Sequence, residues 1–254
     1  MSVDDLTRNK FIKSVEEKIR TQDVQFSILK LIYLIDLGFN KGKTHNALFA
    51  FFDTYFPTIL FESQNIDKLK KIMIETKGEY DFLIKKTSYS LDLGIKKKYY
   101  YNEISSLVLL MLENKKNKKI LAEINTMEKE LLHIIAPNLN ILLPNEVLIK
   151  LLIHTTGLKR LSQLTGSKIQ VLGAEKALHK HKKGKSTSPK YGYIYEVNFI
   201  KKTKSGKLAR YFANKLSIAA KIDYFYKNIN KDFIDTIYSS PMMSDSTSPE
   251  GNLY

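Results

Sequence analysis

Apolar residues recur at steps of three and four along most of this chain, and this spacing constrains the fold more than any other feature. Gly and Pro, which interrupt helices, number only 11 and 6 in 254 residues. Long runs of this spacing with few breakers are typical of helices that bury one face. The sequence therefore predicts a mainly α protein.

The most regular part of the pattern lies between residues 104 and 134, where the average step is about 3.5 residues, as in a coiled-coil seam. Its members are Ile104, Leu107, Met111, Ile120, Ile124, Met127, Leu131 and Ile134. A polar patch at 114–119 interrupts the stripe and predicts a solvated tip or a turn. The stripe predicts a coiled-coil helical arm, which either packs within one chain or pairs two chains.

Other segments are predicted from the same spacing. Residues 5–37 predict one long helix or two short ones, 38–43 a turn, 45–56 a second helix ended by Pro57, and 66–86 a third. Two short helices are expected on either side of Gly157. A further helix begins near Gly206 and is expected to continue to about residue 238.

Pro137 ends the coiled-coil stripe, and we place a domain boundary there. The predicted organisation is a helical, coiled-coil region over 1–136, a second helical domain over 137–238 and a tail over 239–254. The tail is rich in Ser, Pro, Asp and Gly, which predicts disorder.

Composition excludes several classes of protein. With 43% apolar residues the chain can bury a sizeable core, and without cysteine it has neither disulfides nor thiolate metal sites. The first ten residues are polar, and the longest apolar stretch, 26–39, is interrupted by Lys30 and Asp36 and is too short to cross a bilayer. We expect a soluble intracellular protein that does not bind membranes.

Positive charge is concentrated in one part of the chain. Residues 176–221 contain thirteen Lys or Arg and one acid, Glu196, a net +12 out of the formal +15 of the whole chain. Ordinary surfaces mix both signs, so an almost acid-free stretch of this length predicts a binding surface for a phosphate backbone. The alternative is a solvated basic loop followed by an amphipathic surface helix.

The helix that begins near Gly206 has two predicted faces. The buried face is Leu208, Phe212, Leu216, Ala219, Ile222 and Phe225. The exposed face is Lys207, Arg210, Asn214, Ser217 and Lys221. Donors at steps of three and four can follow phosphates along one side of a helix.

The stretch 176–190 is predicted to be a loop, because it mixes cations such as Lys176, Lys185 and Lys190 with Gly184 and hydroxyl residues. Such a loop can approach a backbone closely and donate hydrogen bonds to it. His179 and His181 flank Lys180 and are candidates for stacking on an unpaired base.

Several motifs in this region occur in a recognisable order. They are residues 171–178 (VLGAEKAL), 188–192 (SPKYG), 206–210 (GKLAR) and 215–223 (KLSIAAKID), preceded by Ala136, Pro137, Asn138 and Leu139. Together they resemble the Nop domain family, whose members are scaffold subunits of box C/D ribonucleoproteins that guide 2′-O-methylation of RNA. The resemblance implies an all-α Nop domain after the coiled-coil arm.

The resemblance also implies a composite binding surface, made of a kink-turn RNA and a small kink-turn-binding protein already seated on it. The implied contacts are Gly173, Ala174, Glu175, Lys176, Ala177, Leu178, Lys180, Lys190, Lys207 and Arg210. Glu175 is expected to orient the loop by hydrogen bonds, because a carboxylate beside phosphates would repel them. The coiled coil implies pairing with a second copy or a paralogous Nop protein. The implied location is the nucleolus or nucleus in a eukaryote and the cytoplasm in an archaeon.

The chain departs from the family pattern in three places. His179 and Lys180 stand where many members have an aromatic residue and Arg, and the connection from Ile200 to Gly206 is a few residues shorter than usual. Box C/D members also carry an N-terminal α/β domain that holds fibrillarin. Residues 1–40 are too few and too helical to be that domain, so the resemblance does not extend to the fibrillarin contact.

Alternative functions come from three other observations. A Nop-type splicing factor of the tri-snRNP also lacks the fibrillarin-holding domain, and a coiled-coil protein could dock an acidic protein partner through its basic end. A third alternative, an NTP-dependent enzyme, depends on the likeness of residues 38–44 to a P-loop. This stretch has three residues between its glycines where the motif needs four, and it follows a predicted helix where the motif needs a strand. No carboxylate or thiolate accompanies His179 and His181, and no catalytic grouping is evident, so we expect no metal, no cofactor and no enzyme activity.

Overall fold

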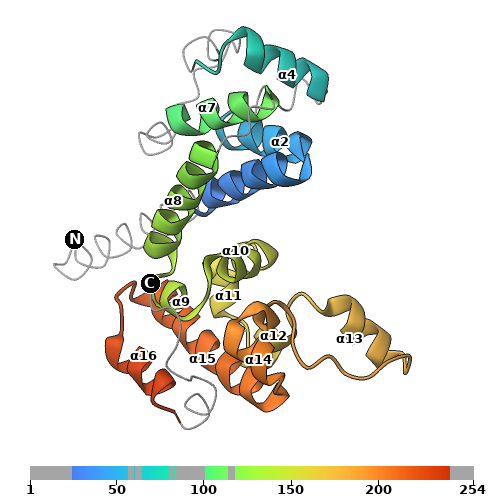
Figure 1. The fold of residues 1–254 in the computed structure, drawn as a ribbon, viewed down its shortest axis with the longest axis vertical. Coiled ribbons are helices and arrows are strands. Elements are labelled where there is room, and N and C mark those ends of the chain that lie inside the picture. Colours follow the sequence, from blue (N-terminus) through green and yellow to red (C-terminus); the bar gives the residue numbers. More distant parts are fainter. Residues whose placement is uncertain are drawn as a thin grey trace, which may run out of the picture. The chain divides into compact units, whose positions relative to one another are not determined.

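The computed structural model describes residues 25–56, 60, 65–79, 83, 101–113 and 118–240. Within these residues the chain forms helices and no strand, which confirms the mainly α prediction. The chain divides into two compact units, residues 1–131 and 132–254, and the division falls inside helix α8, Lys118–Ile135 (Figure 1). None of the described helices combines the length and the apolar character needed to cross a membrane.

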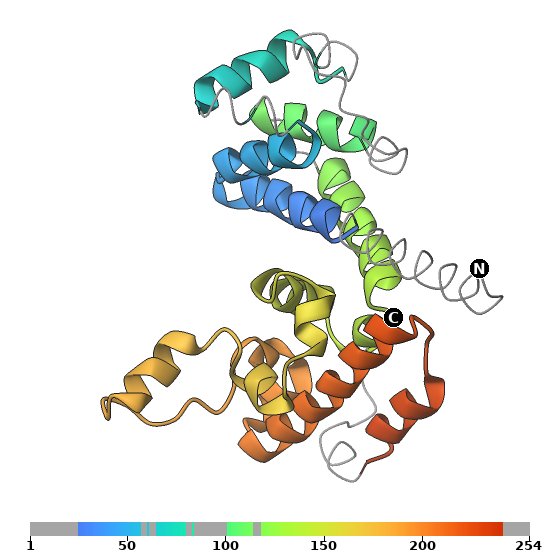
Figure 2. The ribbon, with the colours of Figure 1, turned by 180° about the vertical axis from the view of Figure 1, so that it is seen from behind.

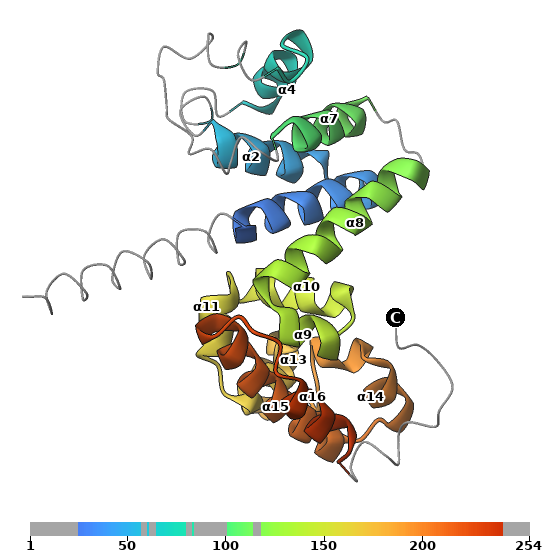
Figure 3. The same ribbon diagram turned by 90° about the vertical axis from the view of Figure 1, so that its left-hand side faces the viewer.

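The first unit is a cluster of helices around an aromatic core. A helix over residues 25–41 is followed by α2 (Thr44–Tyr55), α4 (Ile66–Glu75) and α7 (Tyr101–Leu112), and the last three pack against one another (Figure 3). The Tyr101 ring lies edge-on to Tyr55, with ring centroids 5.2 Å apart, and its hydroxyl donates to the carbonyl of Gly78 at 2.8 Å. Removing the apolar area of these rings from water stabilises the unit.

The predicted boundaries in this unit need correction. The first helix continues to Lys41 and the turn comes only at Gly42, with φ +67°, so Gly38 lies inside a helix and forms no P-loop. The third helix ends at Glu75, not near residue 86, and Gly78 follows in a turn with φ +65°. The predictions for residues 5–24, Pro57, most of the polar patch (114–117) and 241–254 lie outside the described residues.

The apolar stripe predicted as one coiled-coil seam is divided between two helices. Ile104, Leu107 and Met111 are buried on α7, and α7 packs on α2 and α4. On α8 the stripe positions Ile124 and Leu131 are buried, but Ile134 is 44% exposed. Leu132 and Ile135, which lie outside the predicted stripe, are buried at 0% and 1% exposed. An α-helix has 3.6 residues per turn, so a stripe with a step of 3.5 drifts around the helix by about 20° every seven residues, which favours Ile135 over Ile134 near the end of α8. Pairing of α8 with a second helix stays a prediction.

The second unit is arranged around α15, Gly206–Phe225, which packs on α9 (Pro137–Leu142), α11 (Leu158–Ser162) and α12 (Gly166–Val171). Ser205 caps its start by accepting from the N–H of Leu208 at 3.3 Å. Leu208, Phe212 and Leu216 are buried as predicted. The remaining elements are α10 (Asn145–His154), α13 (Glu175–Lys182), the 3₁₀ turn η1 (Tyr193–Glu196), α14 (Asn198–Thr203) and α16 (Lys231–Tyr238).

A buried polar cluster joins the end of α15 to the start of α9. The Asp223 carboxylate accepts from the N–H groups of Asn138 and Leu139, both at 2.9 Å, and from the Asn138 side chain at 2.6 Å. Asn138 in turn donates to the carbonyl of Asn228 and accepts from the N–H of Asn230, each at 2.8 Å. Burial raises the pKa of the Asp223 carboxyl, against the opposing effect of these hydrogen bonds. By accepting from the backbone N–H groups of Asn138 and Leu139, the carboxylate satisfies donors at the start of α9 that have no partner within the helix.

The end of α15 differs from the prediction of one helix to residue 238. The helix ends at Phe225, and α16 begins separately at Lys231 with Asn230 as its cap. Phe225, predicted to be buried, is 70% exposed. The bonds from residues 228 and 230 to Asn138 explain the break, because they draw the backbone back toward α9.

Candidate nucleic-acid interface

The cations of residues 176–221 lie on the surface of the second unit. All thirteen are exposed except Lys215, whose amine lies 5.5 Å from the centre of the Tyr211 ring. Glu196, the one acid in this stretch, accepts from Lys150 at 2.5 Å. The cations are distributed over α13, the segment that follows it, α14 and α15. Their concentration makes this surface the candidate interface for a polyanion.

On α15 the exposed face is close to the prediction, with one correction. Lys207, Arg210, Asn214 and Lys221 are exposed. Ser217, predicted to join them, is 6% exposed and donates to the carbonyl of Leu164 at 2.8 Å. α11 and α12 cover that side of the helix. Lys207 and Lys221 are separated by fourteen positions, about 21 Å along the axis, so the exposed face can follow several phosphates.

Asn214 lies where α15 meets the first turn of α12. A methyl group added at Gly166 would lie 1.9 Å from the Asn214 Oδ1 and 2.7 Å from its Cα. Only glycine allows the two helices to approach this closely. Asn214 therefore borders a packing contact as well as the basic face.

The stretch predicted as a loop from residue 176 is in part a helix. α13 runs over Glu175–Lys182 and ends before Gly184, which has φ +70°. α13 and the segment that follows it project from the second unit (Figures 1 and 2). From here on we call residues 174–191 the arm; this name does not refer to the predicted coiled-coil region. α13 has no buried residue, and the Nδ1 of His181 lies 2.8 Å from the carbonyl of Ser186, inside the arm.

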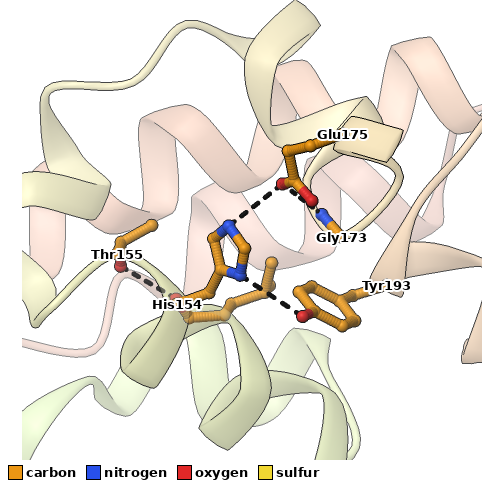
Figure 4. A network of polar contacts seen from close by, with 6 residues as sticks. His154, Thr155, Gly173, Glu175 and Tyr193 are labelled. Carbon is orange, nitrogen blue, oxygen red and sulfur yellow. Dashed lines mark hydrogen bonds and ion pairs between the residues drawn. The ribbon is translucent and has the colours of Figure 1, made fainter. Parts of the chain in front are cut away.

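At the start of the arm, four residues form what we call the root network: Gly173, Glu175, His154 and Tyr193 (Figure 4). The Glu175 Oε1 accepts from the N–H of Gly173 at 2.7 Å and lies 3.0 Å from the Nε2 of His154. The other ring nitrogen of His154 lies 3.3 Å from the Tyr193 hydroxyl. Gly173 has φ +89°, and a methyl group there would lie 2.7 Å from the Tyr193 ring. Glu175 thus bonds to the loop that it was predicted to orient.

The environment of Glu175 favours its charged form. Partial burial raises the pKa of Glu175, but the N–H groups of Gly173 and of Glu175 itself, together with His154, outweigh it. Its pKa therefore lies below the usual value, and the carboxylate is ionised at neutral pH. An ionised Glu175 can accept both hydrogen bonds of the root network.

The far end of the arm is fixed to the start of α15. The Tyr191 hydroxyl donates to the carbonyl of Lys204 at 3.2 Å, and the Tyr191 ring stacks on Tyr195 with centroids 4.9 Å apart. The Lys190 side chain lies along Gly206, where an added methyl group would be 3.6 Å from the Lys190 Cβ. The backbone of Lys190 is therefore beside the first turn of α15, near Lys207.

Most of the predicted contact residues fall into three groups. Lys190 lies beside Gly206 at the start of α15, Lys207 is the residue after Gly206, and Arg210 is about one turn further along the helix. Gly173 and Glu175 belong to the root network, while Ala174 is the residue before α13. On the arm lie Lys176, Ala177, Leu178, His179, Lys180, His181 and Lys185. Asn214 and Lys221 lie further along α15 than Arg210 and belong to none of the three groups.

Sequence reasoning missed His154 and Tyr193, which stand 39 positions apart and share no local pattern. The described residues contain no group of three or more His, Cys, Asp or Glu side chains that could hold a metal. What the surface offers chemically is amines, a guanidinium, hydroxyls and main-chain N–H groups, all of which suit phosphate oxygens.

Part of this sequence is shared with known proteins. The chain matches the model of the Nop family, described as "snoRNA binding domain, fibrillarin", over residues 54–239. Nucleolar protein 56 of Saccharomyces cerevisiae is 42% identical over 99 residues, which are 38% of this chain and 20% of that protein. Human nucleolar protein 56 is 31% identical over 168 residues, 63% of this chain and 27% of that protein. Among solved structures, a chain of a fibrillarin/Nop5p complex is 24% identical with a TM-score of 0.48, over 96% of this chain and 78% of that one.

Proposed function

Since this chain belongs to the Nop family, we propose that it is a non-catalytic RNA-binding scaffold of a box C/D ribonucleoprotein that acts in rRNA 2′-O-methylation or pre-rRNA processing. In this proposal the second unit recognises a kink-turn RNA together with its small kink-turn-binding protein. The observation that carries it is the exposed, almost acid-free surface of residues 176–221 inside the matched family region.

The shape of this surface favours structured RNA. The arm is a basic segment that projects from the second unit, and α15 is a basic helix about 30 Å long. Sequence-specific contacts to RNA are made mostly at splayed bases and irregular regions, and the deep groove of a regular RNA duplex does not admit side chains. A projecting arm suits a kinked RNA with a protein seated beside it.

Partners and location follow from the family as proposals. We propose that a second copy or a paralogous Nop protein pairs with this chain through α8, and that the protein acts in the nucleolus of a eukaryote. We propose that fibrillarin is recruited by the complete box C/D ribonucleoprotein, and we do not assign fibrillarin binding to this chain alone. Light scattering at micromolar concentration tests the pairing, and a mass equal to one chain would contradict it.

The experiment that tests the function is a gel-shift titration with a box C/D kink-turn RNA, with and without the kink-turn-binding protein. We expect a supershifted complex that requires both the RNA and that protein. Equal affinity with and without the protein would reduce the chain to a general basic RNA binder, and no shift would contradict RNA binding.

A second candidate function is docking of an acidic protein through the basic end. It is favoured by the exposed apolar residues beside the basic face: Ile218 at 43%, Phe225 at 70% and Tyr226 at 73%. Large exposed apolar groups of this kind occur at protein interfaces. This candidate predicts binding to a protein in the absence of RNA, which size-exclusion chromatography of nuclease-treated mixtures would detect.

A further inference from the structure

We propose that His154 and Tyr193 are positioning residues: they act through Glu175 to fix the main chain at Gly173 and thereby the direction in which the arm leaves the domain. This proposal rests on the proposed function, because the arm must point at a partner for its direction to matter. Neither residue is placed in contact with RNA. Each acts on the arm through the root network.

α13 is not held by apolar packing. The helix has no buried residue, so it lacks the apolar face that usually fixes a surface helix on its domain. Its direction therefore depends on the contacts at the two ends of the arm, of which the far end is bonded to Lys204 and the near end is the one that α13 adjoins. The proposed role of His154 and Tyr193 is at the near end. There the carboxylate of Glu175, in the first turn, bonds back to the N–H of Gly173 at 2.7 Å and closes the turn that leads into the helix.

Glu175 is held in place by His154. His154 is the last residue of α10, a helix with five buried apolar residues, and the next residue, Thr155, is buried and donates to the carbonyl of Leu151 at 2.8 Å. His154 is therefore supplied by a well-packed part of the unit. Its 3.0 Å contact with Oε1 connects the start of the arm to that part.

Tyr193 contacts His154 and also lies against Gly173. When the imidazole is neutral, the tyrosine O–H can donate to Nδ1 while Nε2–H donates to Glu175, so both ring nitrogens are satisfied in one tautomer. The Tyr193 ring also lies edge-on to His154, with centroids 5.6 Å apart, and occupies the space that a side chain at position 173 would need.

The charged groups around His154 are few in the described structure. Glu175 faces it from α13 and Tyr193 from η1. On its own helix, Lys150 is engaged with Glu196 of η1. Of these groups, only the Glu175 carboxylate is within ion-pair distance of the His154 ring. A substitution of His154 should therefore affect mainly Glu175.

The test uses the full chain and reads the Gly173 amide directly, by ¹⁵N NMR, without RNA. In His154→Ala we expect hydrogen exchange at Gly173 to be about tenfold faster, since the carboxylate is no longer held against it. The pH midpoint at which this amide loses its acceptor should rise toward the ordinary range of a glutamate. His133→Ala is the matched control, because His133 is an exposed histidine on α8.

Two further variants keep the test decisive if His154→Ala perturbs folding. His154→Gln retains an N–H donor on the side chain and should restore slow exchange at Gly173. Tyr193→Phe retains the ring and removes only the hydroxyl, and should shift the midpoint by less than His154→Ala does. Unchanged Gly173 exchange and midpoint in His154→Ala, relative to His133→Ala, would overturn the proposal.

Binding of the kink-turn RNA with its protein then separates this proposal from the proposed function. We expect His154→Ala to lose about five- to tenfold in affinity, with His154→Gln close to the wild type. A changed amide with unchanged affinity would overturn the positioning role. If the wild type itself does not bind, the proposed function fails, and the amide comparison still decides whether the root network holds the arm.

Discussion

Helices α13 and α15 carry the same kind of charge but are held in different ways. α15 buries one face against α9, α11 and α12, and its last turns are bonded to α9 through Asp223. α13 buries no residue and is fixed at its start by a few polar contacts. Cations on a packed helix are already in place for a ligand, whereas cations on the arm lose conformational freedom when they bind. Equal charges on one surface therefore need not contribute equally to affinity.

The largest expected effect comes from releasing α15. Asp223→Ala leaves two backbone N–H groups and the Asn138 amide without their buried acceptor, which should cost about 3–5 kcal/mol of unfolding free energy. Urea denaturation measures this. Lys221→Ala, a change at an exposed site two positions away, is the control and should stay within about 0.5 kcal/mol. Equal effects of the two changes would contradict the role of the polar cluster.

The next effect comes from displacing the start of the arm. Gly173→Ala introduces a side chain at φ +89° and only 2.7 Å from the Tyr193 ring, so affinity for the kink-turn RNA and its protein should fall about tenfold or more. Fluorescence anisotropy measures the loss.

A matched variant separates the two causes of this loss. Gly184→Ala meets the same kind of positive φ, +70°, but its added methyl group has no atom within 4 Å. It should therefore lose clearly less affinity than Gly173→Ala. Similar losses for the two variants would show that backbone strain, and not the Tyr193 contact, decides the effect.

A third effect compares the cations directly. With about six phosphate contacts, log affinity should fall with log salt at a slope of about −4 to −5, and removing either Lys207 and Arg210 or Lys180 and Lys185 should flatten it by about 2. At one salt concentration the α15 pair should cost more affinity than the arm pair, because its side chains stand on a packed helix. An unchanged slope for the α15 pair would contradict the assignment of its exposed face.

The smallest effect is a dependence on pH. Because the pKa of Glu175 is lowered in the folded state, its contribution is present above the ordinary glutamate pKa of about 4.3 and is lost as pH falls through the lowered value. Since Glu175 is about half exposed, solvent screens it and the contribution should be under about 1 kcal/mol. Unfolding titrations between about pH 6 and pH 3 should show the wild type and Glu175→Gln converging at the acid end. A constant difference would contradict this origin.

The helical character and the basic face of α15 could be predicted from the sequence because both depend on local periodicity. Lys207, Arg210 and Lys221 were placed correctly, since steps of three and four bring residues to one side of a helix. Ser217 was not, because a periodic pattern does not reveal how far α11 and α12 reach around the helix. The exposure of Phe225 likewise depends on where the chain turns back toward Asn138.

The arm and its root network were the least predictable parts. α13 lacks the apolar stripe by which helices are recognised, so its Lys and His residues suggested a loop. The contact of His154 with Glu175 and Tyr193 joins three elements and leaves no trace in local spacing. The family motifs identified the region, but the side chains that hold it became visible only in the folded chain.

Hydrogen bonds hold the far end of the arm to residues 170–172, the short stretch from which the arm also begins. The N–H groups of Gly192 and Tyr193 donate to the carbonyls of Gln170 and Leu172, both at 2.8 Å, and the Gln170 side chain donates to the carbonyl of Lys190 at 2.6 Å. The segment between these hydrogen bonds can therefore change in length without disturbing the packing of the second unit. Doubling the length of such a loop costs only about 0.6 kcal/mol of closure entropy. Insertions around Gly184 should change the reach of the protein toward its ligand while leaving its melting temperature almost unaltered, which gives this fold a simple way to diversify.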